Sequence, residues 1–255
     1  MTKARLAAWA LAGAGLPVLC AAAVLLTEVD RSRWLALSPA LLRGVTSDAF
    51  TLEVTLVALL APLAGVAMLS AAARRPLLPA SLVVARRQLL SAAAPLMLAL
   101  AAGVSVSAMA AALGWRLLPD STALVAMSHA TLASAALALA GLGAVAAGAL
   151  RDPLDAAAAS VTAALVLSGG LLVAGPTAGD LPTPLVNVAL IASPLVGTTS
   201  AAHLDLLRSD VFYDLSPVAH RRFDYPDWRA ASALYLAVAL CCGAWTVRHL
   251  RWRAR

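Results

Sequence analysis

Seven long apolar stretches without a Lys, Arg, Asp or Glu cover most of this chain, and they restrict what it can fold into. A helix needs about 20 apolar residues to cross a bilayer, and only helices and closed barrels satisfy their backbone hydrogen bonds in lipid. Hydrophobic residues make up 62% of the chain and charged residues only 13%. We therefore predict an all-α polytopic membrane protein. The stretches are Leu6–Thr27, Val54–Ala73, Gln88–Trp115, Ser121–Leu150, Ala156–Gly179, Leu181–Ala202 and Ala230–Val247.

These stretches leave no room for a separate soluble domain within 255 residues, so any large catalytic machinery must come from another chain. We expect no enzymatic activity and no cofactor or metal in this chain, since its three cysteines have no metal-ligand spacing with histidines. Lys3 and Arg5 before the first stretch resemble a signal peptide, but Thr27-Glu28-Val29 is a poor cleavage site. We expect a retained first helix.

Arginine and lysine near the ends of the stretches predict the orientation. Lys3 and Arg5 precede the first stretch, and Arg74–Arg87 follows the second with four arginines and no acid. These sites share one side if both stretches cross, and positive residues favour the cytoplasm. The basic composition therefore indicates orientation and contact with anionic lipid rather than nucleic acid. We expect a bacterial inner-membrane protein with Glu28–Glu53 on the outer side, its first part forming an interfacial helix.

The sixth stretch, Leu181–Ala202, is the ambiguous one. Seven spans would place the arginine-rich C-terminal tail outside, six would place it inside, and the count of Lys and Arg does not separate the two models. Pro194, Gly197 and Thr198 predict a break in the helix, because proline removes a backbone donor. We favour six transmembrane helices plus a re-entrant segment before the last helix, with both termini cytoplasmic. The expected single domain, 1–255, has spans at about 6–27, 54–73, 88–115, 121–150, 156–179 and 230–247, a re-entrant segment at 181–202 and an external cap at 203–229.

The segment Arg74–Arg87 has two interpretations. A short helix after Pro79 would place Leu82, Val83 and Arg86 near one face and could dock a soluble partner. Alternatively, its arginines anchor the chain at lipid headgroups. The docking candidates are Arg74, Arg75, Leu82, Val83, Arg86 and Arg87.

Polar and small residues within the spans are the other candidates for function. His129 is the only histidine well inside a span, and an ionisable residue there is a functional candidate. An interhelical hydrogen bond, a haem ligand and a proton relay are its alternatives. Gly141 and Gly143, and Gly169 and Gly170, predict close helix crossings. Asp152 before Pro153 predicts a helix N-cap.

The region before the last span carries a set of short motifs. Ser193-Pro194 is followed by Asp205-Leu206-Leu207-Arg208, by Tyr213-Asp214-Leu215-Ser216-Pro217, and by Tyr225-Pro226-Asp227-Trp228. Over about 190–250 the chain resembles permease subunits of the second ATP-binding-cassette exporter family. The resemblance implies six spans with both termini inside, dimerisation or pairing with a second permease, and a cytoplasmic ATPase that binds ATP and docks between spans two and three.

One departure from that family lies at the docking loop, where the usual acidic element after the second span is missing and only arginines remain. The function expected from the resemblance is the membrane subunit of an ATP-driven exporter. The alternative is a membrane anchor or assembly subunit without transport activity.

Overall fold

The computed structural model describes residues 3–32, 39–73, 82–116, 120–150, 152–173, 181–206 and 224–253, and these are helical apart from short connections. Six helices are long and apolar enough to cross a membrane, which confirms the expected class, and the number is seven if the bent pair before the last helix is one broken span. Two shorter helices form a bent pair before the last span. The helices are α1 (Lys3–Ser32), α2 (Pro39–Ala73), α3 (Leu82–Gly114), α4 (Ser121–Ala149), α5 (Pro153–Val173), α7 (Thr183–Ala192), α8 (Pro194–Ala201) and α10 (Trp228–Arg253).

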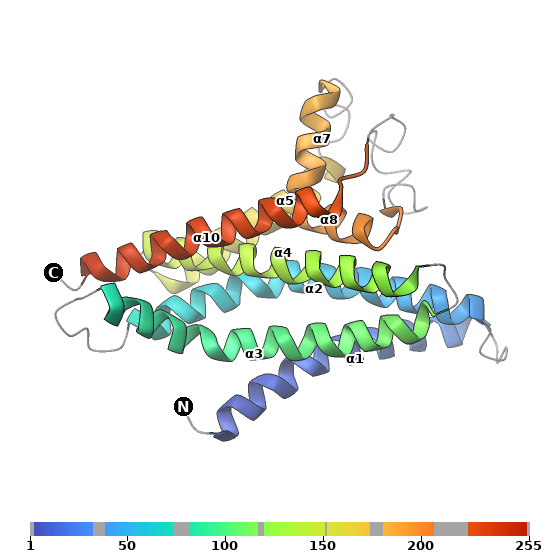
Figure 1. Ribbon diagram of the computed structural model, residues 1–255, viewed down its shortest axis with the longest axis horizontal. Helices are drawn as coiled ribbons and strands as arrows, with labels where there is room; N and C mark the ends of the chain where they lie inside the picture. The colour runs from blue at the N-terminus through green and yellow to red at the C-terminus, as the bar shows by residue number, and fades with distance from the viewer. Residues whose placement is uncertain are drawn as a thin grey trace.

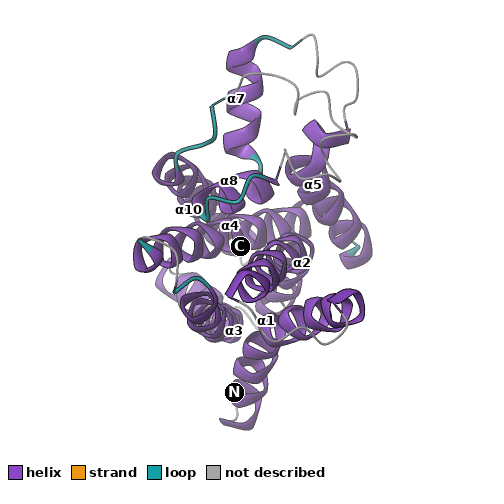
Figure 2. Cartoon of the chain, turned by 90° about the vertical axis from the view of Figure 1, so that its right-hand side faces the viewer, coloured by secondary structure: helices purple, strands orange, loops and turns teal. Residues whose placement is uncertain are grey.

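The six long helices form one bundle with α4 at its centre (Figure 2). More than half of the spanning part of α4 is buried (56%), against 11% for α1 and for α3. α4 packs mainly against α2 and α10, while α1 packs mainly against α3. Both ends of the chain lie toward the same end of the bundle, as Figure 1 shows.

Glycines set the closest helix contacts of the bundle. A Cβ on Gly143 of α4 would collide with the carbonyl oxygen of Pro62 on α2, and one on Gly65 of α2 would collide with the carbonyl oxygen of Ala140. The predicted crossing at Gly143 is therefore confirmed, and Gly141 lies against Cys242 of α10. The prediction for Gly169 is wrong within the described chain, because an added Cβ there would meet nothing within 4 Å. For Gly170 it would meet only the side chain of Val166, one turn away on α5.

The second span begins earlier than expected. We placed its start at Val54, but α2 begins at Pro39 and runs through Arg43, Asp48 and Glu53 without a break. No proline or glycine occurs between Gly44 and Pro62, so nothing in the sequence ends a helix there. The described residues at the two ends of the expected interfacial helix, 28–32 and 39–43, belong to α1 and α2, and residues 33–38 between them lie outside the described residues.

The expected break in the sixth stretch is present, but it lies at Ser193, before the residues from Pro194 to Ser200 over which the turn was expected. α7 and α8 meet at an angle of 82°, with Ser193 between them. Pro194, Gly197 and Thr198 lie in α8 rather than in a turn. Proline is tolerated at the first position of a helix, where its missing N–H has no partner to lose. Figure 1 shows α7 projecting away from the bundle while α8 lies against it.

Candidate functional site

The predicted docking residues lie partly within the described chain. Arg74 and Arg75 fall outside the described residues. Leu82 begins α3, so the expected short helix is instead the first turn of the third span. Val83 is 73% exposed, and Arg86 and Arg87 are exposed beside it. This group lies at the end of the bundle where α10 also ends (Figure 1).

The bend between α7 and α8 is fixed by hydrogen bonds from two other helices. The Tyr235 hydroxyl of α10 lies 2.9 Å from the carbonyl oxygen of Ile191 and 2.8 Å from that of Ser193, and can donate to either. Ser193 donates to the carbonyl oxygen of Ser168 on α5 at 2.9 Å, and its Oγ accepts from the N–H of Val196. The carbonyl oxygen of Ser193 also accepts from the N–H of Gly197 in α8 at 2.9 Å, so the Tyr235 hydroxyl is free to serve the carbonyl of Ile191 at the break. Backbone at membrane depth requires such partners inside the protein.

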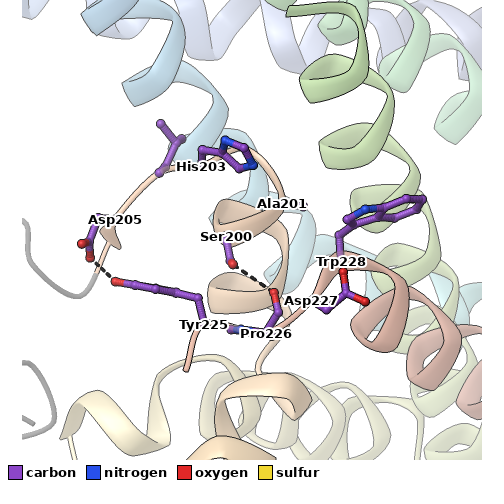
Figure 3. Close-up of a pocket in the computed structure, with 9 residues that line it drawn as sticks. Ser200, Ala201, His203, Asp205, Tyr225, Pro226, Asp227 and Trp228 are labelled. Atoms are coloured by element: carbon purple, nitrogen blue, oxygen red, sulfur yellow. Dashed lines mark hydrogen bonds between the residues drawn. The ribbon is translucent and has the colours of Figure 1, made fainter. Parts of the chain in front are cut away.

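A hollow of about 420 Å³ lies where α8 and α10 diverge, and Figure 3 shows the residues around it. Tyr225 donates to Asp205 across its mouth, and Ser200 donates to the carbonyl oxygen of Pro226 at 3.1 Å. Most of the expected external cap, residues 207–223, lies outside the described residues. In the sequence it lies between the two groups of residues that line this hollow.

The most polar buried site is elsewhere, where three helices bring together Glu53, Ser107 and His129. Ser107 of α3 donates to Oε2 of Glu53 on α2, and Nε2 of His129 on α4 lies 3.0 Å from the same Ser107 oxygen. The three side chains are 3%, 5% and 4% exposed. Ser107 is about 10 Å from the end of α3 at 1.5 Å per residue, so the site lies well inside the bundle.

The hydrogen bonds of His129 identify its proton positions. Nδ1 lies 2.8 Å from the carbonyl oxygen of Val125, and a carbonyl can only accept, so Nδ1 carries a hydrogen. Two protons remain for the path from Glu53 through Ser107 to Nε2. Either a neutral Glu53 donates to Ser107 and Ser107 donates to Nε2, or Ser107 donates to an ionised Glu53 and a protonated Nε2 donates to Ser107. Both arrangements are neutral overall, and they differ by moving two protons along one path.

Aromatic rings cover one side of this polar cluster. The ring of Phe50 lies 5.2 Å from the ring of His129 and 5.7 Å from that of Trp115 between centroids. Nε1 of Trp115 donates to Ser47 at 3.4 Å, which fixes the indole against α2. The imidazole of His129 therefore has an aromatic ring as well as polar groups beside it.

An apolar groove of about 230 Å³ reaches the cluster from the other side. It lies between α1, α2, α3 and α4, and Glu53 is the only ionisable residue in its described lining. The lining on α2 extends from Glu53 to Ala64, which is about 16 Å along a helix. Leu60 and Trp9, which also line it, are 49% and 44% exposed, so the groove is open at the outer surface of the bundle.

Sequence reasoning found one of these three residues. The expected interhelical hydrogen bond of His129 is confirmed, and both of its ring nitrogens are engaged. Glu53 was missed because we assigned it to a loop. The uninterrupted run from Gly44 to Pro62 was the available signal for a helix at this position. Within the described residues, no group of three or more His, Cys, Asp or Glu could hold a metal ion. The expected N-cap is also present, since Asp152 accepts from the N–H of Leu154 at 2.7 Å.

Comparison with protein-family models, with curated proteins and with solved structures gave no match. The resemblance to exporter permeases therefore stays a prediction, and the function has to be argued from the geometry of the chain.

Proposed function

We propose that the chain is the transmembrane permease subunit of an ATP-driven exporter, working with a separate cytoplasmic ATPase. The observation that best supports this proposal is the arrangement of six spans with a bent helix pair before the last one. The bend is hydrogen-bonded to α5 and α10 rather than left free. An anchor subunit has no need of a broken helix stabilised inside its bundle, whereas a transport path is a common reason for one.

The charge distribution supports an orientation with both termini in the cytoplasm of a bacterium. The end of the bundle that holds both termini carries two acids, Asp152 and Asp155, and seven described basic residues, namely Lys3, Arg5, Arg86, Arg87, Arg248, Arg251 and Arg253. The opposite end carries a larger share of aspartates, among them Asp120, Asp205, Asp224 and Asp227. Basic residues next to spans favour the cytoplasmic side.

The start of α3 is the surface that we assign to the ATPase. Val83, Arg86 and Arg87 are exposed and lie within five residues of one another on a helix. An apolar side chain next to two guanidinium groups suits a partner surface that combines an apolar pocket with carboxylates. A second permease, either another copy or a related chain, would complete the transporter.

The proposal is tested by purifying the tagged chain from membranes that contain its candidate ATPase. We expect an ATP-binding-cassette ATPase to co-purify, and Arg86→Glu with Arg87→Glu to weaken this association at least tenfold while leaving membrane insertion unchanged. Arg248→Glu is the matched control, because Arg248 is exposed at the same end of the bundle but belongs to α10.

A reporter fused after Arg255 tests the orientation in the same strain. A reporter active only in the cytoplasm should work there. Insertion without any ATPase partner would instead support the anchor subunit, and activity of a periplasmic reporter at this position would contradict the proposed orientation.

A further inference from the structure

The apolar groove and Glu53 form a site that the proposed function does not use. Glu53 has no arginine or lysine partner among the described residues, and its one hydrogen-bonding partner there is Ser107. A carboxylate inside a membrane bundle needs a positive partner, because an uncompensated charge at this depth is expensive. In the free protein that positive charge is a proton, carried by Glu53 itself or by His129. A cationic ligand in the groove would supply this positive charge in place of the proton.

The shape of the groove determines what kind of cation can bind. Glu53, Val104 of α3 and Leu132 of α4 lie at one end of the lining, and Ala64 lies at the other end of the α2 side. The rest of the described lining is apolar and consists of alanine, glycine, leucine and valine residues and Trp9. A ligand must therefore place a charged head at one end and an apolar body along the rest. The volume exceeds the 150 Å³ of an engineered cavity that binds benzene.

Close backbone contacts between α1 and α3 form one wall of this space. Gly13 of α1 packs against the backbone of Ala99 on α3, and Gly103 packs against the backbone of Gly13. All three line the groove. The exposed flanks at Trp9 and Leu60 let a molecule enter from the lipid phase rather than from water.

We propose that this groove binds an amphipathic amine taken from the membrane, with its ammonium group on Glu53 and its apolar body between α1, α2, α3 and α4. The ammonium replaces one of the two protons shared by Glu53, Ser107 and His129. Ser107 then donates its remaining proton to the carboxylate or to Nε2 of His129. The balance is one ligand cation bound and one proton released.

The surroundings of Glu53 support this exchange. Among the described residues, α4 contributes His129 and α1 contributes the thiol of Cys20, whereas α3 contributes the non-titrating Ser107. Binding should therefore tighten as the pH rises over the range in which the amine stays charged. The inference rests on the proposed function only where it makes the amine a substrate, since the binding itself requires no ATPase.

The test uses the full chain purified in lipid nanodiscs, with octylammonium as the ligand and octanol as a neutral ligand with the same tail. Glu53→Gln keeps the shape of the side chain and removes its charge, and Asp155→Asn, on an exposed position of α5, is the matched control. We expect octylammonium to bind at least about tenfold more weakly to Glu53→Gln and equally to Asp155→Asn. One proton should be released for each bound amine.

Two further measurements separate the site from general partition into lipid. Ala12→Phe should fill the groove and weaken binding, while Ala8→Phe, exposed on α1 but outside the lining, should not. Dicyclohexylcarbodiimide, which adds to protonated carboxyl groups in apolar surroundings, should modify Glu53, and octylammonium should protect it. Equal binding of octanol, unchanged binding to Glu53→Gln or protection absent at Glu53 would overturn the inference. None of these results depends on whether an ATPase co-purifies.

Discussion

The crossing of α2 and α4 makes a prediction that compares two glycines which look alike in sequence. Gly143→Ala would place a Cβ against the carbonyl oxygen of Pro62, and the facing atoms belong to the backbone of α2. Neither backbone can rotate away as a flexible side chain would, so the helices must separate. Gly169→Ala places the same methyl group in open space within the described chain.

The magnitude follows from the difference between the two variants. Both replace a helical glycine by alanine and gain up to about 1 kcal/mol from helix propensity, so this gain cancels. Overpacking a tight contact costs about 1–3 kcal/mol, and a backbone-to-backbone contact belongs at the upper end. We therefore expect Gly143→Ala to be about 3 kcal/mol less stable than Gly169→Ala, which corresponds to roughly 6–12 °C in Tm.

Thermal unfolding of the purified variants in one detergent, followed by tryptophan fluorescence and by the loss of monodisperse protein, measures this difference. Gly169→Ala should unfold at the wild-type temperature or up to about 4 °C above it, because its gain from helix propensity is at most about 1 kcal/mol. If Gly143→Ala unfolds at the same temperature as Gly169→Ala, the close approach of α2 and α4 is refuted. Gly169→Ala is a sufficient control, because it is also a glycine-to-alanine substitution within a helix.

Two other predictions concern hydrogen bonds inside the bundle, and both are read out as shifts in the unfolding temperature. Tyr235→Phe should destabilise the protein by about 1–2 kcal/mol because one carbonyl group at the α7–α8 bend loses its partner. Tyr225→Phe, whose hydroxyl bonds the exposed Asp205, should change the Tm less, and equal shifts would contradict the assigned role of Tyr235. Ser107→Ala should also cost about 1–2 kcal/mol by separating Glu53 from His129. Ser105→Ala is the control and should change the Tm little, because it removes only an exposed hydrogen bond within α3. A Ser107→Ala protein as stable as this control would show that Ser107 does not connect the cluster.

The spans could be predicted from sequence because length and hydropathy alone decide whether a helix can cross a bilayer. The start of α2 could not, since the carboxyl group of Glu53 is buried against protein, and the exposed Asp48 lies in the part of the helix before it. A hydropathy profile assigns such charged residues to a loop. A break near Pro194 could be predicted because proline removes a backbone donor. Its exact position could not, since Pro194 begins α8 and the expected turn residues Gly197 and Thr198 are helical.

The polar cluster was hidden from sequence reasoning for a different reason. Ser107 is 54 residues from Glu53 and 22 from His129, and each residue lies on a different helix. No local spacing connects them, and a serine in a span is usually bonded to its own backbone, as Ser105 is. Gly143 and Gly169 show the same limit, because the space beside a helical glycine depends on the helix that faces it.

The close crossings and the groove have one physical origin. Where two small residues face each other, as Gly65 of α2 and Ala140 of α4 do, the helices approach until no space is left. Where α1 meets α3 through Gly13 and Gly103, the contact is equally close, but the alanines beside it are too short to fill the space toward α2 and α4. The groove is therefore held open by rigid backbone contacts rather than by bulky side chains. Larger residues in its walls would close it without loosening the bundle.

Ala12→Phe should therefore weaken binding of the amine while leaving the unfolding temperature within about 2 °C of wild type, as expected for a surface substitution. A large fall in Tm for this variant would mean that the groove is part of the packed core and not a site.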